Sequence, residues 1–261
     1  MNEVYIGISV QVILAVIVPI VLLIIFQRKK WLSWKSLGIG ILIFFVFSQL
    51  LEKMLHIAVL APTGTQLKWS ANPYLFAIYG GLAAGIFEEM GRFFAFKVLL
   101  KKNHQYSDGL SYGLGHGGIE AILIGGLSGL SSIILYSMVQ SGAAVGILGE
   151  SPIPKEQLAN IQTQFADAQF WVFAAGGMER IFALALHLAL SLLVLYGVKQ
   201  RQFIYVLYAI LFHAGVNFLP ALYQAGVIKN LLLVEFILFI VAIFCLYFIV
   251  KIKDRFADPI K

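Results

Sequence analysis

The sequence predicts an all-α, polytopic membrane protein, a bundle of about seven transmembrane helices. Hydrophobic residues make up 60% of its 261 residues and charged residues only 12%, and the mean hydropathy is +0.88. A soluble domain carries roughly twice that charged fraction, so a soluble protein is excluded. The length suits one compact bundle. We therefore expect a single integral membrane domain over residues 1–261, with core helices at about 73–223, in the cell membrane.

Seven apolar runs each reach the roughly 20 residues that a spanning helix needs. They are Tyr5–Phe26, Leu37–Leu60, Pro73–Leu100, Leu110–Val139, Phe170–Val198, Phe203–Tyr223 and Leu231–Val250. The first run lacks a basic segment before it and a small-residue cleavage site after it. It is followed by Arg28, Lys29 and Lys30, so we expect a retained helix and not a signal peptide.

Basic residues in the connections predict the orientation. One side would carry twelve of them: Arg28, Lys29, Lys30, Lys35, Lys101, Lys102, Lys199, Arg201, Lys251, Lys253, Arg255 and Lys261. The other side would carry only Lys53, Lys68, Lys155 and Lys229. By the positive-inside rule the N-terminus is outside and the C-terminus cytoplasmic. The +6 net charge thus marks topology, and no nucleic-acid partner is expected.

Residues 140–169 form the one long connection, on the predicted outer face. Leu158, Ile161 and Phe165 recur there at helical spacing. Two interpretations stay open: an interfacial helix lying on the membrane surface, or an ordinary polar loop.

The third run contains three charged residues deep in apolar sequence: Glu88, Glu89 and Arg92. Charged groups are costly in hydrocarbon and generally line a site within the bundle. Glu88 and Arg92 are one helical turn apart and share a face. At 1.5 Å per residue, Glu88 lies roughly 18 Å from the cytoplasmic end of its span.

Later runs repeat this pattern at similar depths. The residues are His116 and Glu120 in the fourth run, Glu179, Arg180 and His187 in the fifth, and His213 and Asn217 in the sixth. We expect His116 and His213 to belong to a functional site. For His187 a hydrogen bond across helices is the favoured role, and Glu179 with Arg180 is as readily a structural ion pair. Glu52 and His56 in the second run are interpreted as structural or peripheral.

Two pairs of helices resemble each other. Met90–Phe96 matches Met178–Leu184, and His116–Glu120 matches His213–Asn217, in the same order. Parallel repeats are related by an axis along the membrane normal, and transporters built this way place their site at the repeat interface. The predicted core is therefore two repeated helix pairs that share one polar layer.

The residue types in this layer suit hydrolysis. Histidines and carboxylates from separate helices are ligands for a divalent metal such as zinc, and His116 and His213 are the predicted metal ligands. A carboxylate beside a bound or confined water can act as a general base, and asparagine or arginine can stabilise an oxyanion. The residues alone do not decide between a metal-bound and a glutamate-activated water.

Three motifs resemble those of the CPBP (CAAX protease and bacteriocin-processing) intramembrane proteases. They are Glu88-Glu89-x-x-Arg92, Tyr112-x-x-x-His116 and His213-x-x-x-Asn217. The family has one more residue between its glutamates and arginine, and phenylalanine in place of Tyr112. Nearly the whole chain resembles the YhfC-type bacterial membrane proteins, regarded as distant relatives of that superfamily.

The resemblance implies an intramembrane endopeptidase that hydrolyses a peptide bond of a membrane protein or peptide. Glu88 would activate water, Glu89 or Arg92 would position it, and His116, His213 and Asn217 would complete the site. Glu120, Glu179, Arg180 and His187 would support it. Two alternatives remain: a non-catalytic, protease-like scaffold or immunity-type protein, and a transporter of small solutes or ions. Membrane lipid is an expected partner in each case, and the sequence does not predict an oligomeric state.

Overall fold

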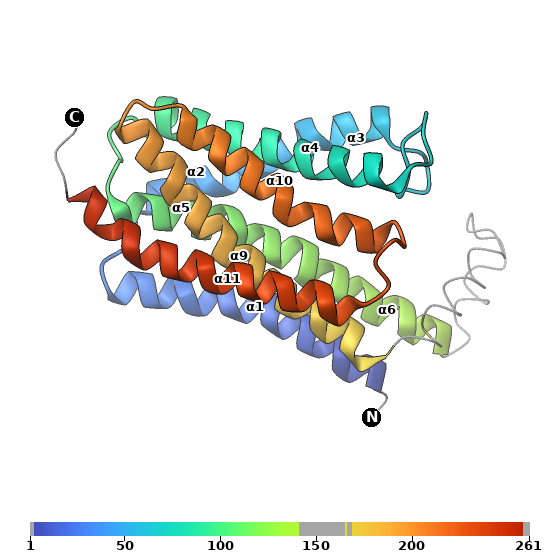
Figure 1. The fold of residues 1–261 in the computed structure, drawn as a ribbon. Helices are drawn as coiled ribbons and strands as arrows, with labels where there is room; N and C mark the ends of the chain where they lie inside the picture. Colours follow the sequence, from blue (N-terminus) through green and yellow to red (C-terminus); the bar gives the residue numbers. More distant parts are fainter. Residues whose placement is uncertain (1–2, 141–164, 166–168, 258–261) are drawn as a thin grey trace. The chain divides into compact units, whose positions relative to one another are not determined.

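The computed structural model describes residues 3–140, 165 and 169–257, and this part of the chain is helical (Figure 1). The helices are α1 (Glu3–Arg28), α2 (Trp34–Ile43), α3 (Lys53–Val59), α4 (Pro73–Phe94), α5 (Tyr106–Glu120), α6 (Ser128–Gln140), α9 (Phe170–Lys199), α10 (Ile204–Gln224) and α11 (Leu231–Ile252). Three π-helical segments, η1 (Phe44–Glu52), η2 (Ala95–Leu99) and η3 (Ala121–Leu127), and the 3₁₀ segment η4 (Lys253–Phe256) continue some of them. The predicted all-α class is confirmed.

Each predicted span corresponds to one continuous helix, with ends that differ by a few residues. Within the described residues, six of these helices are long and apolar enough to cross a membrane. The exception is α4 with η2, which contains Glu88, Glu89, Arg92 and Lys97. The multi-pass membrane class is therefore confirmed. The predicted orientation, the helix repeat and the single domain stay predictions, and the connection at 140–169 lies outside the described residues except for its ends and Phe165.

The chain divides into two compact units. The first comprises Met1–Pro19 and Glu120–Ile181, and the second comprises Ile20–Ile119 and Phe182–Lys261. The division falls within α1, within α9, and at the last residue of α5.

In the first unit, the start of α1 packs on α6. The rings of Tyr5 and Tyr136 meet edge to face at 4.9 Å between centroids, and the hydroxyls of Tyr5 and Ser137 are 2.9 Å apart. Gln11 donates a hydrogen bond to the backbone oxygen of Gly125 at 3.1 Å. The side-chain amide is thereby satisfied inside an apolar region, where a lone polar group is costly.

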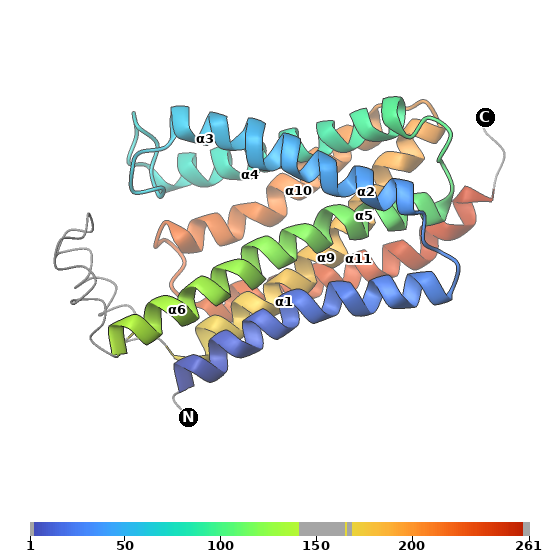
Figure 2. The same ribbon diagram turned by 180° about the vertical axis from the view of Figure 1, so that it is seen from behind.

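In the second unit, α4 and α10 lie side by side, as Figures 1 and 2 both show. Gly81 and Gly85 of α4 form a Gly-x-x-x-Gly stripe at this contact. A Cβ atom at Gly81 would lie 2.5 Å from the backbone oxygen of Ala214, and one at Gly85 would lie 2.7 Å from that of Ile210. Small residues allow such close approach between membrane helices, and this approach brings Glu89 within reach of α10.

Gly81→Ala is expected to destabilise the protein by about 1–3 kcal/mol, because the added methyl overpacks against the backbone of α10. The matched control is Gly80→Ala, since a Cβ there meets nothing within 4 Å. Alanine favours helix over glycine by about 1 kcal/mol, so the control is expected to be neutral or stabilising. Reversible unfolding in detergent measures both variants, and equal unfolding midpoints would contradict this account of the contact.

The start of α5 is fixed against α2. Asp108 accepts a hydrogen bond from the backbone N–H of Gln105, the residue before the helix, at 3.0 Å, an arrangement typical of a helix N-terminus. The hydroxyl of Ser36 in α2 donates to the same carboxylate at 2.8 Å. A Cβ atom at Gly115 would lie 2.1 Å from the backbone oxygen of Leu37. The backbones of the two helices are therefore in close contact at Gly115, the residue before His116.

Candidate functional site

Helix α4 supplies three side chains to a polar cluster inside the second unit. Asn72 caps the helix by accepting hydrogen bonds from backbone N–H groups at its start, and Gly81 and Gly85 fix it against α10. Glu89 and Arg92, three residues apart on one face, form a direct ion pair, and both are fully buried. Glu88 is 6% exposed. All three charges are therefore shielded from the lipid.

Helices α5 and α9 bring two histidines together. Gly113 and Gly117 of α5 face α9, where a Cβ at Gly117 would lie 2.9 Å from the Cβ of His187. Because these two positions carry no side chain, the rings of His116 and His187 come to 4.9 Å between centroids. Phe44 packs edge to face on His116 at 5.3 Å. Both histidines are almost completely buried.

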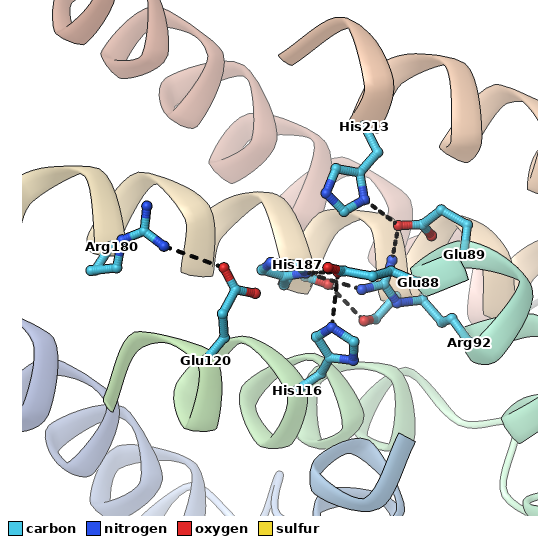
Figure 3. A network of polar contacts seen from close by, with 9 residues as sticks. Glu88, Glu89, Arg92, His116, Glu120, Arg180, His187 and His213 are labelled. Atoms are coloured by element: carbon cyan, nitrogen blue, oxygen red, sulfur yellow. Dashed lines mark hydrogen bonds and ion pairs between the residues drawn. The ribbon is translucent and has the colours of Figure 1, made fainter. Parts of the chain in front are cut away.

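Glu88 lies between these two histidines (Figure 3). Its Oε2 atom is 3.0 Å from Nε2 of His116 and 3.8 Å from Nδ1 of His187. Each of the three residues offers a ligand atom, and these atoms lie within 4.8 Å of one another. Imidazoles are ligands that zinc takes in hydrolases, and a carboxylate beside them can serve as a further ligand or as a general base. The donor chemistry therefore fits a divalent metal.

Glu89 connects α4 to α10. Its Oε1 atom is paired with Arg92 and lies 2.8 Å from Nδ1 of His213. A carboxylate paired with arginine accepts hydrogen bonds, so Nδ1–H of His213 donates to it. In the neutral ring the proton is then on Nδ1 and the lone pair on Nε2. Glu89 thus holds both the orientation and the tautomer of His213.

Arg92 connects Glu89 with His187. Its Nη2 atom lies 3.1 Å from Nδ1 of His187, and because a guanidinium has only donors, Nδ1 accepts. Arg92 is also 5.9 Å from the ring centroid of Tyr112, whose hydroxyl is buried without a hydrogen-bond partner among the described residues. One guanidinium therefore orients His187, neutralises Glu89 and covers the Tyr112 ring.

The histidine pairing differs from the predicted one. Sequence reasoning paired His116 with His213 as metal ligands, whereas His187 is the histidine beside His116 and Glu88. His213 contacts the ring of His187 edge to face at 5.5 Å. The signal that could have placed His187 is its helical register against Gly113 and Gly117, which determines the side of α9 that faces α5.

The other residues that the sequence predicted are Asn217, Glu120, Glu179 and Arg180. Asn217 is half-buried in α10, one turn after His213, and no hydrogen bond of its side chain is found among the described residues. Glu120 belongs to the first unit, where Arg180 donates to it at 3.4 Å and is also paired with Glu179. Whether any of these residues supports the site stays a prediction.

A further buried acid lies in the same unit, within electrostatic range of Glu88 and His213. Glu52, 6% exposed, is 3.3 Å from Nε2 of His56, and Nδ1 of that ring is 2.7 Å from the hydroxyl of Tyr79. The structural or peripheral role expected for this pair stays a prediction, and Glu52 provides a buried glutamate for comparison with Glu88.

Comparison with known proteins adds a family. Residues 14–238 match the family model described as YhfC intramembrane metalloprotease. The chain is 42% identical over 243 residues to the uncharacterized membrane protein YhfC of Bacillus subtilis (strain 168), covering 93% of this chain and 94% of that protein. No solved structure matches.

Proposed function

Since the chain belongs to the YhfC family of membrane proteins, we propose that it is an intramembrane metalloprotease that hydrolyses a peptide bond. The observation that carries the proposal is the meeting of Glu88, His116 and His187 from three helices, with ligand atoms within 4.8 Å of one another. The three side chains are buried in a bundle of membrane-spanning helices. Burying such groups is costly, which favours a functional reason for their presence.

In this proposal His116 and His187 would hold the metal, zinc or another divalent ion. When bound, such a metal would supply Lewis-acid chemistry, polarising a carbonyl and lowering the pKa of a water molecule. Nδ1 of His187 accepts a hydrogen bond from Arg92, which also pairs with Glu89, so Arg92 would orient this histidine. Arg92 is then a positioning residue.

Glu88 is the general base of the proposed reaction. Its carboxylate accepts a proton from the attacking water and can return it to the leaving amine. Glu89 is less suited to this role, because its ion pair with Arg92 stabilises the charged carboxylate and so makes it a weaker base. The distance of 3.0 Å to His116 keeps the Glu88 carboxylate beside the metal ligands.

Asn217 and His213 complete the proposed site. By resemblance to the His-x-x-x-Asn motif of the CPBP proteases, Asn217 stabilises the oxyanion formed at the carbonyl. Nε2 of His213, with its tautomer set by Glu89, is oriented as a hydrogen-bond acceptor. It contributes to binding or orienting the peptide.

The test maps new peptide termini in membranes of cells that produce either the wild-type protein or His116→Gln. We expect a set of membrane-protein cleavages that occur with the wild type and disappear with the variant, and that a zinc chelator also suppresses. Matching termini in both membranes would contradict the proposal. A folded, metal-loaded wild-type protein that yields no cleavage would instead favour the scaffold alternative.

A further inference from the structure

Two adjacent hollows lie where α9, α10 and α11 meet, and all their lining residues belong to the second unit. The first has a volume of about 420 Å³ and is apolar, with walls that include Leu190, Leu193, Leu211, Phe244, Cys245 and Phe248. The second has a volume of about 580 Å³ and is lined by Tyr196, Tyr205, Tyr247, Lys251 and Arg255, among others. Leu193 and Phe248 line both hollows. They therefore form one groove, apolar at one end and basic at the other.

The apolar end of the groove opens on the surface of the bundle. Leu211, Phe244 and Tyr208 at its rim are all more than half exposed. In a membrane-spanning bundle such a surface faces lipid, so a lipid chain can enter from the side without crossing water.

The basic end is built from aromatic rings and two cations. Tyr196 and Tyr205 pack edge to face at 5.2 Å, and Nζ of Lys251 lies 5.7 Å from the ring centroid of Tyr247. Neither Lys251 nor Arg255 forms an ion pair with any residue that the structure describes. Tyrosine and basic residues gather where a helix leaves the membrane, and the sequence predicts that this end of α11 is cytoplasmic.

We propose that this groove binds one anionic phospholipid. An acyl chain occupies the apolar hollow, and the phosphate lies between Lys251 and Arg255 with the tyrosine hydroxyls around it. Basic pockets between transmembrane helices are suited to anionic head groups. The apolar and basic parts follow one another as the parts of an amphiphile do. The site uses none of the residues of the proposed protease centre, so this proposal does not depend on the protease activity.

The experiment is native mass spectrometry of the full-length protein in detergent. The protein is titrated with phosphatidylglycerol or phosphatidylcholine of identical acyl chains. The wild type is expected to retain one phosphatidylglycerol in preference to phosphatidylcholine. Lys251→Gln/Arg255→Gln is expected to weaken phosphatidylglycerol binding about tenfold or more, because each basic residue contributes attraction to the anionic lipid.

The control is Lys101→Gln/Lys102→Gln, which removes the same charge from exposed residues that do not line the groove. Phosphatidylglycerol binding should be unchanged in this control. An equal loss in both double variants, or equal binding of the two lipids to the wild type, would overturn the proposal. So would competition by glycerol phosphate as strong as that by the lipid, which would indicate a site for free phosphate. Displacement of phosphatidylglycerol only by a transmembrane peptide would indicate a protein occupant.

Discussion

Glu88→Gln is expected to lower peptide-bond cleavage by about a hundredfold to ten-thousandfold, the usual contribution of a general base. Glutamine keeps the shape of the side chain and can still make a hydrogen bond with His116, but it cannot accept a proton. The two imidazoles remain, so the variant is expected to stay folded and to retain metal. Cleavage of a substrate identified by terminus mapping measures the first effect, and elemental analysis the second.

Glu52→Gln is the matched control for this variant. Glu52 is as buried as Glu88, lies in the same unit and also pairs with a histidine. Its replacement should leave cleavage unchanged if the effect at Glu88 is chemical. Undiminished cleavage by Glu88→Gln would exclude the base role. Loss of both metal and cleavage would instead make Glu88 a metal ligand.

Arg92→Met is expected to cause the largest loss of stability, about 3–5 kcal/mol, because it leaves a buried charge on Glu89 without its partner. Both members of this pair are completely shielded from solvent and lipid. The variant also removes the hydrogen bond to His187. Unfolding in detergent followed by circular dichroism measures the change.

The double variant Glu89→Leu/Arg92→Met tests whether the loss of stability comes from the unpaired charge or from lost packing. Replacing both charges by apolar groups is often neutral or stabilising, so the double variant is expected to be more stable than Arg92→Met alone. It should still lack activity, since the orientation of His187 and His213 is lost. If the double variant loses as much stability as Glu89→Leu and Arg92→Met lose separately, added together, the ion pair is not the source of the effect.

The spans and the membrane class could be predicted because both depend on composition averaged over 20 residues. The seven apolar runs became helices with ends displaced by a few residues, and the resemblance to the YhfC family is confirmed by the match over residues 14–238. The π-helical segments were not predicted, since they depend on local packing and not on hydropathy.

The sequence predicted that the residues of the candidate site lie at a similar depth, but it did not predict which of them are in contact. Helical rise fixes the depth of Glu88 and of the histidines, and these side chains do meet at one level (Figure 3). Rotation about each helix axis decides which histidine faces which carboxylate. That rotation is set by close contacts with the neighbouring helix at Gly113, Gly117 and Gly85, which spacing within one helix does not reveal. For this reason His187, expected mainly to tie helices together, lies beside His116.

Metal content of the purified protein tests the proposed centre most directly. After loading with zinc and removal of excess, the wild type and Glu52→Gln are expected to retain one zinc ion per chain. His116→Ala and His187→Ala should each lose it while remaining folded. Two results would contradict the assignment of this centre. One is cleavage of the substrate by wild-type protein without any bound metal, and the other is retention of as much zinc by both histidine variants as by the wild type.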